Sequence, residues 1–351
     1  MTSRPVGDGR YLVTGGAGFI GANFVHLLME RYPRARVTVL DKLTYAGNPA
    51  NLAPVRDRET FRFVQGDIAD DGLVEPLIAE GFDFVINFAA ETHVDRSIGD
   101  PASFVKTDVF GVYTLLEAIR THPVSLFVQI STDEVYGEVM EGAATEEAPL
   151  MPRNPYSASK AGGDRLAFSY WATYGLPVVV TRCSNNYGPY QYPEKLIPLF
   201  VTNAIDHQPM PIYGNGRNQR DWIHVRDHAE AILTLIESEG VEGELFNIGA
   251  GNEKTVLEIA DLLLSLTGRP TSLLSPVVDR PGHDRRYAVD SSKLRRKTGW
   301  APRVSFEEGV RETVDWYKAR EEWWRPLKSG EFLEYYKRNY RFLPPGAEPE
   351  K

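Results

Sequence analysis

The stretch from Ile130 to Lys160 carries several groups that can move protons. It begins Ile-Ser-Thr-Asp-Glu-Val-Tyr-Gly at residues 130–137 and ends Tyr-Ser-Ala-Ser-Lys at residues 156–160. Hydroxyls, two adjacent carboxylates, a phenol and an ammonium are thus grouped just after an apolar, strand-like run. Such groups could remove a proton from an alcohol, donate one to a leaving hydroxyl and remove one from carbon.

The tyrosine and the lysine of this stretch suit the oxidation of an alcohol. Tyr156 and Lys160 are four positions apart, which places both side chains on one face of a helix. A phenol with a pKa near 10 is a poor base at neutral pH. A nearby ammonium and a nicotinamide cation would both lower that pKa. With Thr132 or Ser131 sharing the hydroxyl proton, the pattern predicts hydride transfer from an alcohol to a nicotinamide.

The adjacent carboxylates suit an elimination. Asp133 and Glu134 could act as a neutral acid that protonates a departing hydroxyl and an ionised base that removes a proton from carbon. Repulsion between like charges in a partly dry site would help to separate their pKa values. The alternative is a pair of ordinary loop carboxylates, one of which acts as a cap.

The elements around residues 10–41 predict where the electrons go. An apolar run at residues 10–14 leads into a turn with glycines at 15, 18 and 21, then an amphipathic stretch, then the β-branched run 37–40 and Asp41. This order is typical of a dinucleotide-binding unit. Asp41 lies 20 residues after Gly21, where a carboxylate can bind the adenosine ribose and favours NAD over NADP. Lys42 weakens that preference, and a simple strand-end turn is the alternative for Asp41.

Short apolar runs and helical patterns alternate through the first half of the chain. The apolar runs lie at residues 61–65, 84–88, 125–131 and 178–181, and the helical patterns at 71–80, 101–121 and 156–174. The alternation predicts an α/β fold with a Rossmann-type, doubly wound parallel sheet. Ligands bind at the carboxyl ends of such strands, so Asp67 at one of them could reach the adenine edge or cap the next helix.

The character of the sequence changes after residue 184, where prolines and aromatics become frequent. We expect residues 1–184 to form the NAD-binding domain, with a return to the sheet near residues 222–249. Residues 185–345 would form mainly a smaller substrate-binding lobe. Arg220 and the loop 279–286, with three arginines and a histidine, could bind a diphosphate there. Solvated basic loops are the alternative.

Composition excludes several other classes of protein. The 351 residues have a net charge of −9 and no sustained basic run, unlike a duplex nucleic-acid binder. No apolar run reaches the ~18 residues of a membrane span, and we expect no signal peptide. Cys183 is the only cysteine, which favours a cytoplasmic location. The seven histidines show no paired spacing, so no metal site is expected.

Longer motifs resemble one family. The glycine turn of residues 14–21 together with residues 156–160 is similar to the extended short-chain dehydrogenase/reductases. Within that family, residues 132–134 resemble the dTDP-glucose 4,6-dehydratases, and so do residues 41–48, 193–199 and 279–287. The similarity spans residues 10–340. It implies a homodimeric, NAD-dependent hydro-lyase of deoxysugar biosynthesis that makes dTDP-4-keto-6-deoxyglucose and water from dTDP-glucose.

The resemblance also implies a sequence of proton transfers. Tyr156 would take the proton of the sugar 4-hydroxyl as C4 is oxidised. The new ketone acidifies C5, from which Glu134 would remove a proton while Asp133 protonates the departing 6-hydroxyl. Hydride then returns to C6. Open alternatives are a UDP-glucose 4,6-dehydratase, a nucleotide-sugar 4-epimerase, and a catalytically silent NAD-sensing scaffold.

By the same resemblance the expected site residues fall into three groups. The catalytic residues are Thr132, Asp133, Glu134, Tyr156 and Lys160. Besides Tyr156 and Lys160, the cofactor residues are Gly15, Gly18, Phe19, Ile20, Gly21, Asp41, Lys42, Leu43, Thr44, Asp67, Ile68, Phe88, Ala89, Ala90, Thr92, Thr107, Ser131 and Asn186. The substrate residues are Thr92, Thr132, Asn185, Lys195, Leu196, Pro211, Ile212, Tyr213, Arg220, Asp279, Arg280, His283 and Tyr340. Near Val256, relatives can carry an asparagine, so valine there removes a hydrogen bond.

Overall fold

The computed structural model describes residues 4–342 except 280, 281 and 341. A large sheet of seven parallel strands runs in the order β10–β6–β5–β4–β1–β2–β3. Its strands are β1 (Arg10–Thr14), β2 (Arg36–Asp41), β3 (Phe61–Gln65), β4 (Phe84–Asn87), β5 (Leu126–Thr132), β6 (Val178–Cys183) and β10 (Leu245–Ile248). The strand order reverses at β1, which confirms the predicted doubly wound α/β fold.

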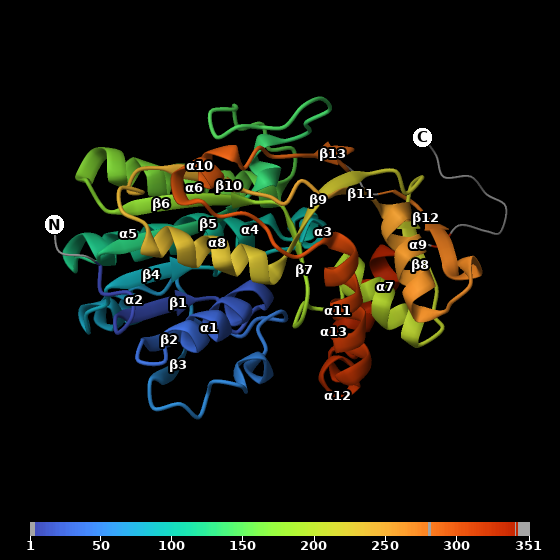
Figure 1. Ribbon diagram of the computed structural model, residues 1–351, viewed down its shortest axis with the longest axis horizontal. Helices are drawn as coiled ribbons and strands as arrows, with labels where there is room; N and C mark the ends of the chain where they lie inside the picture. Colours follow the sequence, from blue (N-terminus) through green and yellow to red (C-terminus); the bar gives the residue numbers. More distant parts are fainter. Residues whose placement is uncertain (1–3, 280–281, 341, 343–351) are drawn as a thin grey trace.

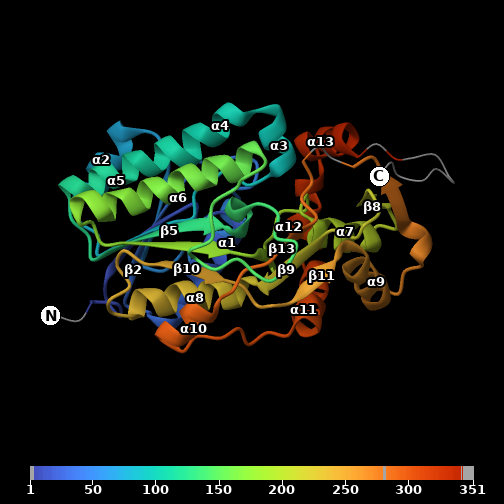
Figure 2. The same cartoon turned by 90° about the horizontal axis from the view of Figure 1, so that it is seen from above.

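Helices cover both faces of this sheet (Figures 1 and 2). One layer contains α1 (Phe19–Arg31), α8 (Val225–Glu237) and α10 (Ser292–Thr298), and the other contains α2 (Asp71–Ala79), α5 (Val112–Thr121) and α6 (Pro155–Tyr174). The central strands are covered on both sides: every residue of β4, β5 and β6 is buried. Such runs are typical of a parallel sheet between two helical layers.

The helix expected at residues 101–121 is continuous but irregular. It consists of α4 (Pro101–Val105), a π-helical turn η2 (Lys106–Gly111) and α5. Before it lies the short helix α3 (Val94–Gly99). The wider turn of η2 brings the buried Asp108 next to α6, where the Ser159 hydroxyl donates a hydrogen bond to its carboxylate at 2.6 Å. Turns of this kind often accompany functional sites.

Short strands and five helices build most of the smaller lobe, at the right of Figure 1. The strand β9 (Gln219–His224) pairs with β7 (Asn185–Tyr187), β11 (Glu253–Thr255) and β13 (Arg286–Tyr287), and β8 (Met210–Tyr213) pairs with β12 (Leu274–Val277). The helices are α7 (Leu196–Ile205), α9 (Val256–Thr267), α11 (Phe306–Ala319), α12 (Glu321–Trp324) and α13 (Glu331–Asn339). Single 3₁₀ turns complete the described chain: η1 (Pro49–Leu52), η3 (Asp133–Tyr136), η4 (Thr271–Leu273) and η5 (Pro326–Lys328).

The return of the chain to the large sheet occurs later than residue 222. The strand β9 lies in the small sheet, α8 packs on α1, and only β10 pairs with β6. The apolar run after Arg220 gave no signal of which sheet it would join.

Among the described residues, no helix is long and apolar enough to cross a membrane.

Candidate active site

The glycine turn of residues 15–21 lies at the carboxyl end of β1, as predicted from the sequence. Gly15 has a φ of +67°, and a Cβ there would lie 2.5 Å from the backbone nitrogen of Ala89. A Cβ on Gly21 would lie 2.4 Å from the carbonyl oxygen of Gly15. Only glycine fits these two positions. Gly18 ends the turn in an extended conformation without a capping side chain, so the backbone N–H groups that begin α1 can bind an anion.

Asp41, the last residue of β2, organises the loop around this turn. Its carboxylate accepts hydrogen bonds from the backbone of Ala17 at 2.9 Å and of Leu43 at 2.8 Å. Burial raises the pKa of Asp41 above its usual value, although both backbone donors oppose the shift. The carboxylate borders the cavity described below. A ribose hydroxyl there would be a third donor to Asp41.

The end of β5 turns directly into η3 and so places the carboxylate pair. Thr132 is the N-cap of this turn: its Oγ1 accepts from the backbone of Glu134 at 3.3 Å and donates to Asp133 Oδ1 at 3.2 Å. Asp133 Oδ2 is buried and has no hydrogen-bond partner among the described residues. Burial, followed by the charge of Glu134, raises the pKa of Asp133 well above its usual value. A carboxyl in this environment is held neutral and can donate a proton.

The helix α6 presents Tyr156 and Lys160 to the same place. A capping box of Asn154 and Ser157 fixes the first turn, with Asn154 Oδ1 accepting from the Ser157 backbone at 2.9 Å, and Pro155 follows the cap. Lys160 is 6% exposed, and its Nζ donates to the carbonyl oxygen of Ile130 at 2.7 Å. The end of β5 and the start of α6 are therefore joined by a buried ammonium.

The pKa of Tyr156 is raised, whereas we expected nearby positive charge to lower it. Burial, followed by the charge of Glu134, raises the pKa of Tyr156 well above its usual value, and the Thr132 hydroxyl lowers it only in part. Desolvation dominates the pKa of Tyr156, and the Lys160 ammonium donates to Ile130 O, so the expected lowering of this pKa by Lys160 stays a prediction. Additional positive charge near the phenol is needed before it can act as a base.

These groups border one cavity at the carboxyl ends of the strands. It is lined by all five residues expected to be catalytic, Thr132, Asp133, Glu134, Tyr156 and Lys160. The expected cofactor residues that line it are Gly15, Gly18, Phe19, Ile20, Gly21, Asp41, Lys42, Thr44, Asp67, Ile68, Phe88, Ala89, Ala90, Thr92, Thr107, Ser131 and Asn186. Leu43 does not line it: its φ is +58° and its side chain packs against the core of the sheet.

A second cavity adjoins the first, and the two share Thr92, Glu134, Asn185, Asn186, Gln191, Glu194 and Lys195. Of the expected substrate residues it is lined by Thr92, Asn185, Lys195, Leu196, Pro211, Tyr213, Arg220, His283 and Tyr340, whereas Thr132 lines only the first cavity. Ile212 is not among them, because alternate residues of β8 face opposite sides and Ile212 is buried in the lobe core. Asp279 lies outside the lining and accepts from His283 Nδ1 at 2.7 Å. Arg280 lies outside the described residues.

Arg220 supplies a buried cation to this second cavity. It is 8% exposed, its guanidinium donates to the carbonyl of Asp284 at 2.8 Å, and it lies 4.3 Å from the centre of the Tyr287 ring. Arg286 belongs elsewhere: it forms an ion pair with Glu253 at 2.6 Å and lines neither cavity. Val256 does line the second cavity, so an apolar side chain borders it at this position.

Several acidic or basic side chains at the cavities were not among the expected site residues; Asp95 and Lys254 of the second cavity are two of them. Glu91 lines the first cavity, and burial, followed by the charge of Asp108, raises its pKa to about 7. Glu194 lines both cavities, is 3% exposed and pairs with Arg96 at 3.2 Å. His93 lines the second cavity. Glu91 and His93 come shortly after the apolar run at residues 84–88, and Glu194 lies in the motif at residues 193–199, so each had a usable signal in the sequence.

Comparison with known proteins places the chain in a family. A model of the GDP-mannose 4,6-dehydratase family matches residues 12–313. A dTDP-glucose 4,6-dehydratase of Streptomyces niveus is 54% identical over 324 residues, which are 91% of this chain and 96% of that protein. The chain therefore belongs to this dehydratase family.

Solved structures agree with that assignment. A dTDP-glucose 4,6-dehydratase of Streptomyces venezuelae, crystallised with NAD, is 50% identical with a TM-score of 0.89, covering 91% of this chain and all of that one. A UDP-glucose 4-epimerase of Thermus thermophilus in complex with NAD is 33% identical with a TM-score of 0.81, covering 89% of this chain and 99% of that one. The fold is thus retained in proteins whose sequence identity to this chain is much lower.

Proposed function

We propose that this member of the dehydratase family converts dTDP-glucose into dTDP-4-keto-6-deoxyglucose and water, with NAD as its cofactor. The observation that carries the proposal is one cavity in which an aspartate and a glutamate on η3 face a tyrosine and a lysine on α6. Oxidation needs the tyrosine and the lysine, and elimination needs the two carboxyls. An enzyme with both sets can remove water from a sugar without net oxidation.

The residues at the end of β1 and β2 fit NAD. The turn excludes any Cβ at Gly15 and Gly21, which leaves room for a pyrophosphate against the backbone N–H groups of α1. Asp41 would hold the adenosine ribose, and Lys160 the nicotinamide ribose. When bound, NAD supplies a hydride acceptor that can return the hydride to the same sugar. Its positive ring is also the charge that the buried Tyr156 phenol lacks.

The groups at β5 and α6 would begin the reaction at the sugar 4-hydroxyl. Tyr156 takes the hydroxyl proton, and Thr132 Oγ1, which caps η3, shares it. The ammonium of Lys160 lies at the start of the same helix and stabilises the phenolate as it forms. Ser131 also faces this cavity, and its buried Oγ has no partner among the described residues.

The carboxyl pair would then carry out the elimination. Once C4 is a ketone, the C5 proton is acidic enough for the Glu134 carboxylate to remove. Asp133 holds its proton because burial raises its pKa, and it gives that proton to the 6-hydroxyl, which leaves as water. Reprotonation at C5 and reduction at C6 complete a 4-keto-6-deoxy sugar. Glu134 lines both cavities, so it would lie between the cofactor and the substrate.

The second cavity would hold the nucleotide. The buried Arg220 and the ammonium of Lys195, which donates to Thr92 O, are cations suited to a diphosphate. Tyr340 is 8% exposed and lies 5.5 Å from the ring of Tyr213, where a nucleobase could stack. Leu196, Pro211, Val256 and Asn185 supply mostly apolar walls.

The proposal is tested by giving the purified protein dTDP-glucose and UDP-glucose separately and identifying the products by NMR. We expect the dTDP sugar to yield the 4-keto-6-deoxy product without added reductant. Faster turnover of UDP-glucose would change the nucleotide and leave the chemistry intact. Recovery of only the C4 epimer would make the protein an epimerase, and no reaction with either sugar would contradict the proposal.

We also propose that the protein acts as a cytoplasmic homodimer. The helices α5 and α6 lie side by side on one outer face (Figure 2) and contact each other. On this surface Val105, Phe110, Tyr113 and Tyr174 are 55%, 49%, 42% and 55% exposed. A second copy of the chain would bury such apolar side chains. Light scattering of the wild type and of Phe110→Arg should give a dimer and a monomer.

A further inference from the structure

We propose that Arg182 is a positioning residue that holds the proton-transfer groups of α6 and those of η3 in a fixed relation to each other. The inference rests on the proposed function, because it assigns Tyr156 to oxidation and Glu134 to elimination. Arg182 lies in β6 and is 1% exposed. It lines neither cavity, so it acts through other residues.

One edge of the guanidinium is bound to α6. Arg182 Nε and Nη2 donate to the two oxygens of Asp164 at 2.8 and 3.0 Å. Asp164 is fully buried and lies four residues after Lys160 and eight after Tyr156. These three side chains share one face of the helix. The fork of two parallel bonds therefore fixes both the depth and the rotation of α6.

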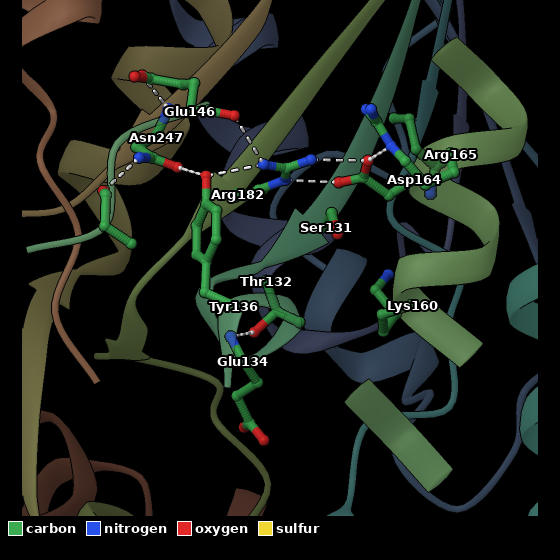
Figure 3. Close-up of polar contacts among 12 residues, drawn as sticks. Ser131, Thr132, Glu134, Tyr136, Glu146, Lys160, Asp164, Arg165, Arg182 and Asn247 are labelled. Carbon is green, nitrogen blue, oxygen red and sulfur yellow. Dashed lines mark hydrogen bonds and ion pairs between the residues drawn. The ribbon is translucent and has the colours of Figure 1, made fainter. Parts of the chain in front are cut away.

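The other edge of the guanidinium is bound to η3. Arg182 Nη1 donates to the hydroxyl oxygen of Tyr136 at 2.8 Å, and the cation lies 4.8 Å from the centre of that ring. Tyr136 is two residues after Glu134 in the same turn. Its hydroxyl donates to Asn247 Oδ1 at 2.7 Å. Figure 3 shows Arg182 between the helix that carries Lys160 and Asp164 and the turn that carries Glu134 and Tyr136.

The hydrogen-bond network continues through Asn247 into the neighbouring strand β10. The Asn247 side chain donates to the carbonyl of Ala144 at 2.9 Å, and its backbone N–H donates to Glu146 Oε1 at 2.8 Å. The register of β5 and β6 pairs Arg182 with Ser131, one residue before Thr132. The guanidinium of Arg182 in β6 therefore joins α6 and η3 directly and reaches β10 through Tyr136.

The burial of the charged Arg182 and Asp164 side chains requires an explanation. Desolvation of an arginine and an aspartate is costly, and apolar replacements of such pairs are often as stable or more stable. Stability alone is therefore a weak reason for Arg182. A network that fixes two catalytic elements gives a different reason, because a displacement of about 1 Å can slow a reaction by about 100-fold. A purely structural role would slow oxidation and elimination together, whereas a positioning role would separate them.

The test removes one hydroxyl at the η3 edge of the network. Tyr136→Phe keeps the ring and leaves Asp164 bound to Arg182, so η3 is loosened while α6 is not. In single turnovers with dTDP-glucose we expect the rise of reduced-nicotinamide absorbance to stay within about twofold of wild type. Product formation and exchange of the C5 proton with deuterated solvent should fall by about 10- to 100-fold. Reduced nicotinamide should then accumulate.

The matched control is Tyr11→Phe. Tyr11 is fully buried in β1, and its hydroxyl donates to the carbonyl of Val6 at 2.7 Å, away from the cavities. The variant Tyr11→Phe should lower the melting temperature about as much as Tyr136→Phe and leave the rates of oxidation and elimination unchanged. A second variant, Arg182→Lys, keeps the charge and loses the fork, so oxidation as well as elimination should slow.

Each outcome decides the question. Selective loss of elimination in Tyr136→Phe supports the proposal. Unchanged rates in both Tyr136→Phe and Arg182→Lys overturn it, as does an equal slowing of oxidation and elimination in Tyr136→Phe. Wild-type turnover of dTDP-glucose is measured in the same experiment. If the wild type makes no keto sugar, the proposed function fails, and that result is distinct from a failure of the role of Arg182.

Discussion

The two cavities are built in different ways. The first takes its lining from consecutive strand ends of one parallel sheet and from the turns that follow them. The second takes its lining from β8, β9, the start of α7 and the end of α13, which are far apart in the sequence. Parallel strands bring their carboxyl ends to one edge, so a local motif predicts a spatial site. No such rule governs the smaller lobe.

This contrast predicts that variants of the two cavities affect different quantities. Residues at the sheet edge should control the chemical steps, and residues of the lobe should control binding of the nucleotide sugar. The contrast fails if a sheet-edge variant acts only on substrate binding or if a lobe variant acts only on the chemical steps.

Tyr156→Phe removes the proposed base at the sheet edge. We expect kcat to fall by about 1,000-fold, since a positioned acid or base contributes about 100- to 10,000-fold. Binding of NAD should persist because Lys160 and Asp41 remain. Steady-state kinetics and calorimetry measure the two effects. The control is Tyr170→Phe on the same helix, whose hydroxyl bonds to Glu117 at 2.7 Å; a similar loss in both variants would contradict the role of Tyr156.

Glu134→Gln should stop the reaction after oxidation. We expect product formation to fall by about 100-fold, while reduced nicotinamide still forms when dTDP-glucose is added, because Tyr156 and Lys160 are intact. Stopped-flow absorbance and NMR follow the two steps. Glu141→Gln, in the exposed connector that follows η3, should behave as wild type. Loss of both steps in Glu134→Gln would show that the carboxylate also serves oxidation.

Arg220→Met tests the lobe. Loss of a charge-assisted contact with a diphosphate should raise KM for dTDP-glucose by about 10- to 100-fold and change the affinity for NAD little. Arg286→Met is the matched control, because Arg286 lies in the neighbouring strand β13 and pairs with Glu253 away from both cavities. If the two variants raise KM equally, the diphosphate does not bind at Arg220.

Glu91→Gln should have the smallest effect, on stability and only above acidic pH. Burial first and the charge of Asp108 second raise the pKa of Glu91 to about 7. A raised pKa in the folded state means that its contribution to stability is fully present below the unfolded-state pKa of about 4.3 and is lost as pH rises through 7. The variant should therefore melt at a temperature about 2 °C or more above wild type at pH 8, and the gain should shrink toward pH 5. A pH-independent difference would contradict the assignment.

The sequence predicted much of the sheet because its signals are local. The glycine turn, the acid 20 residues after Gly21 and the apolar runs with helices between them follow from backbone geometry, and each lies where it was expected. The turn from β5 into the pair Asp133 and Glu134 was also visible in the sequence. Leu43 was the exception: its left-handed conformation directs an apolar side chain into the core.

The smaller lobe could be predicted only in part because its signals are not local. Ile212 and Tyr213 are adjacent in the sequence but face opposite sides of β8, which only the pairing of that strand could reveal. The strand β9 joined the small sheet, and its partners come from 30 or more residues away. Glu194 reaches both cavities from the loop before α7, and the motif at residues 193–199 did not show which of its side chains would face them.

The proposed function requires that one sugar is oxidised at C4, dehydrated and reduced at C6 within this cavity. The most direct test uses dTDP-glucose carrying deuterium at C4, with the purified protein and unlabelled NAD. We expect a 4-keto-6-deoxy product in which the deuterium is found at C6, since the hydride is returned to the same molecule. Deuterium retained at C4 of an epimer, or lost from the product, would contradict it.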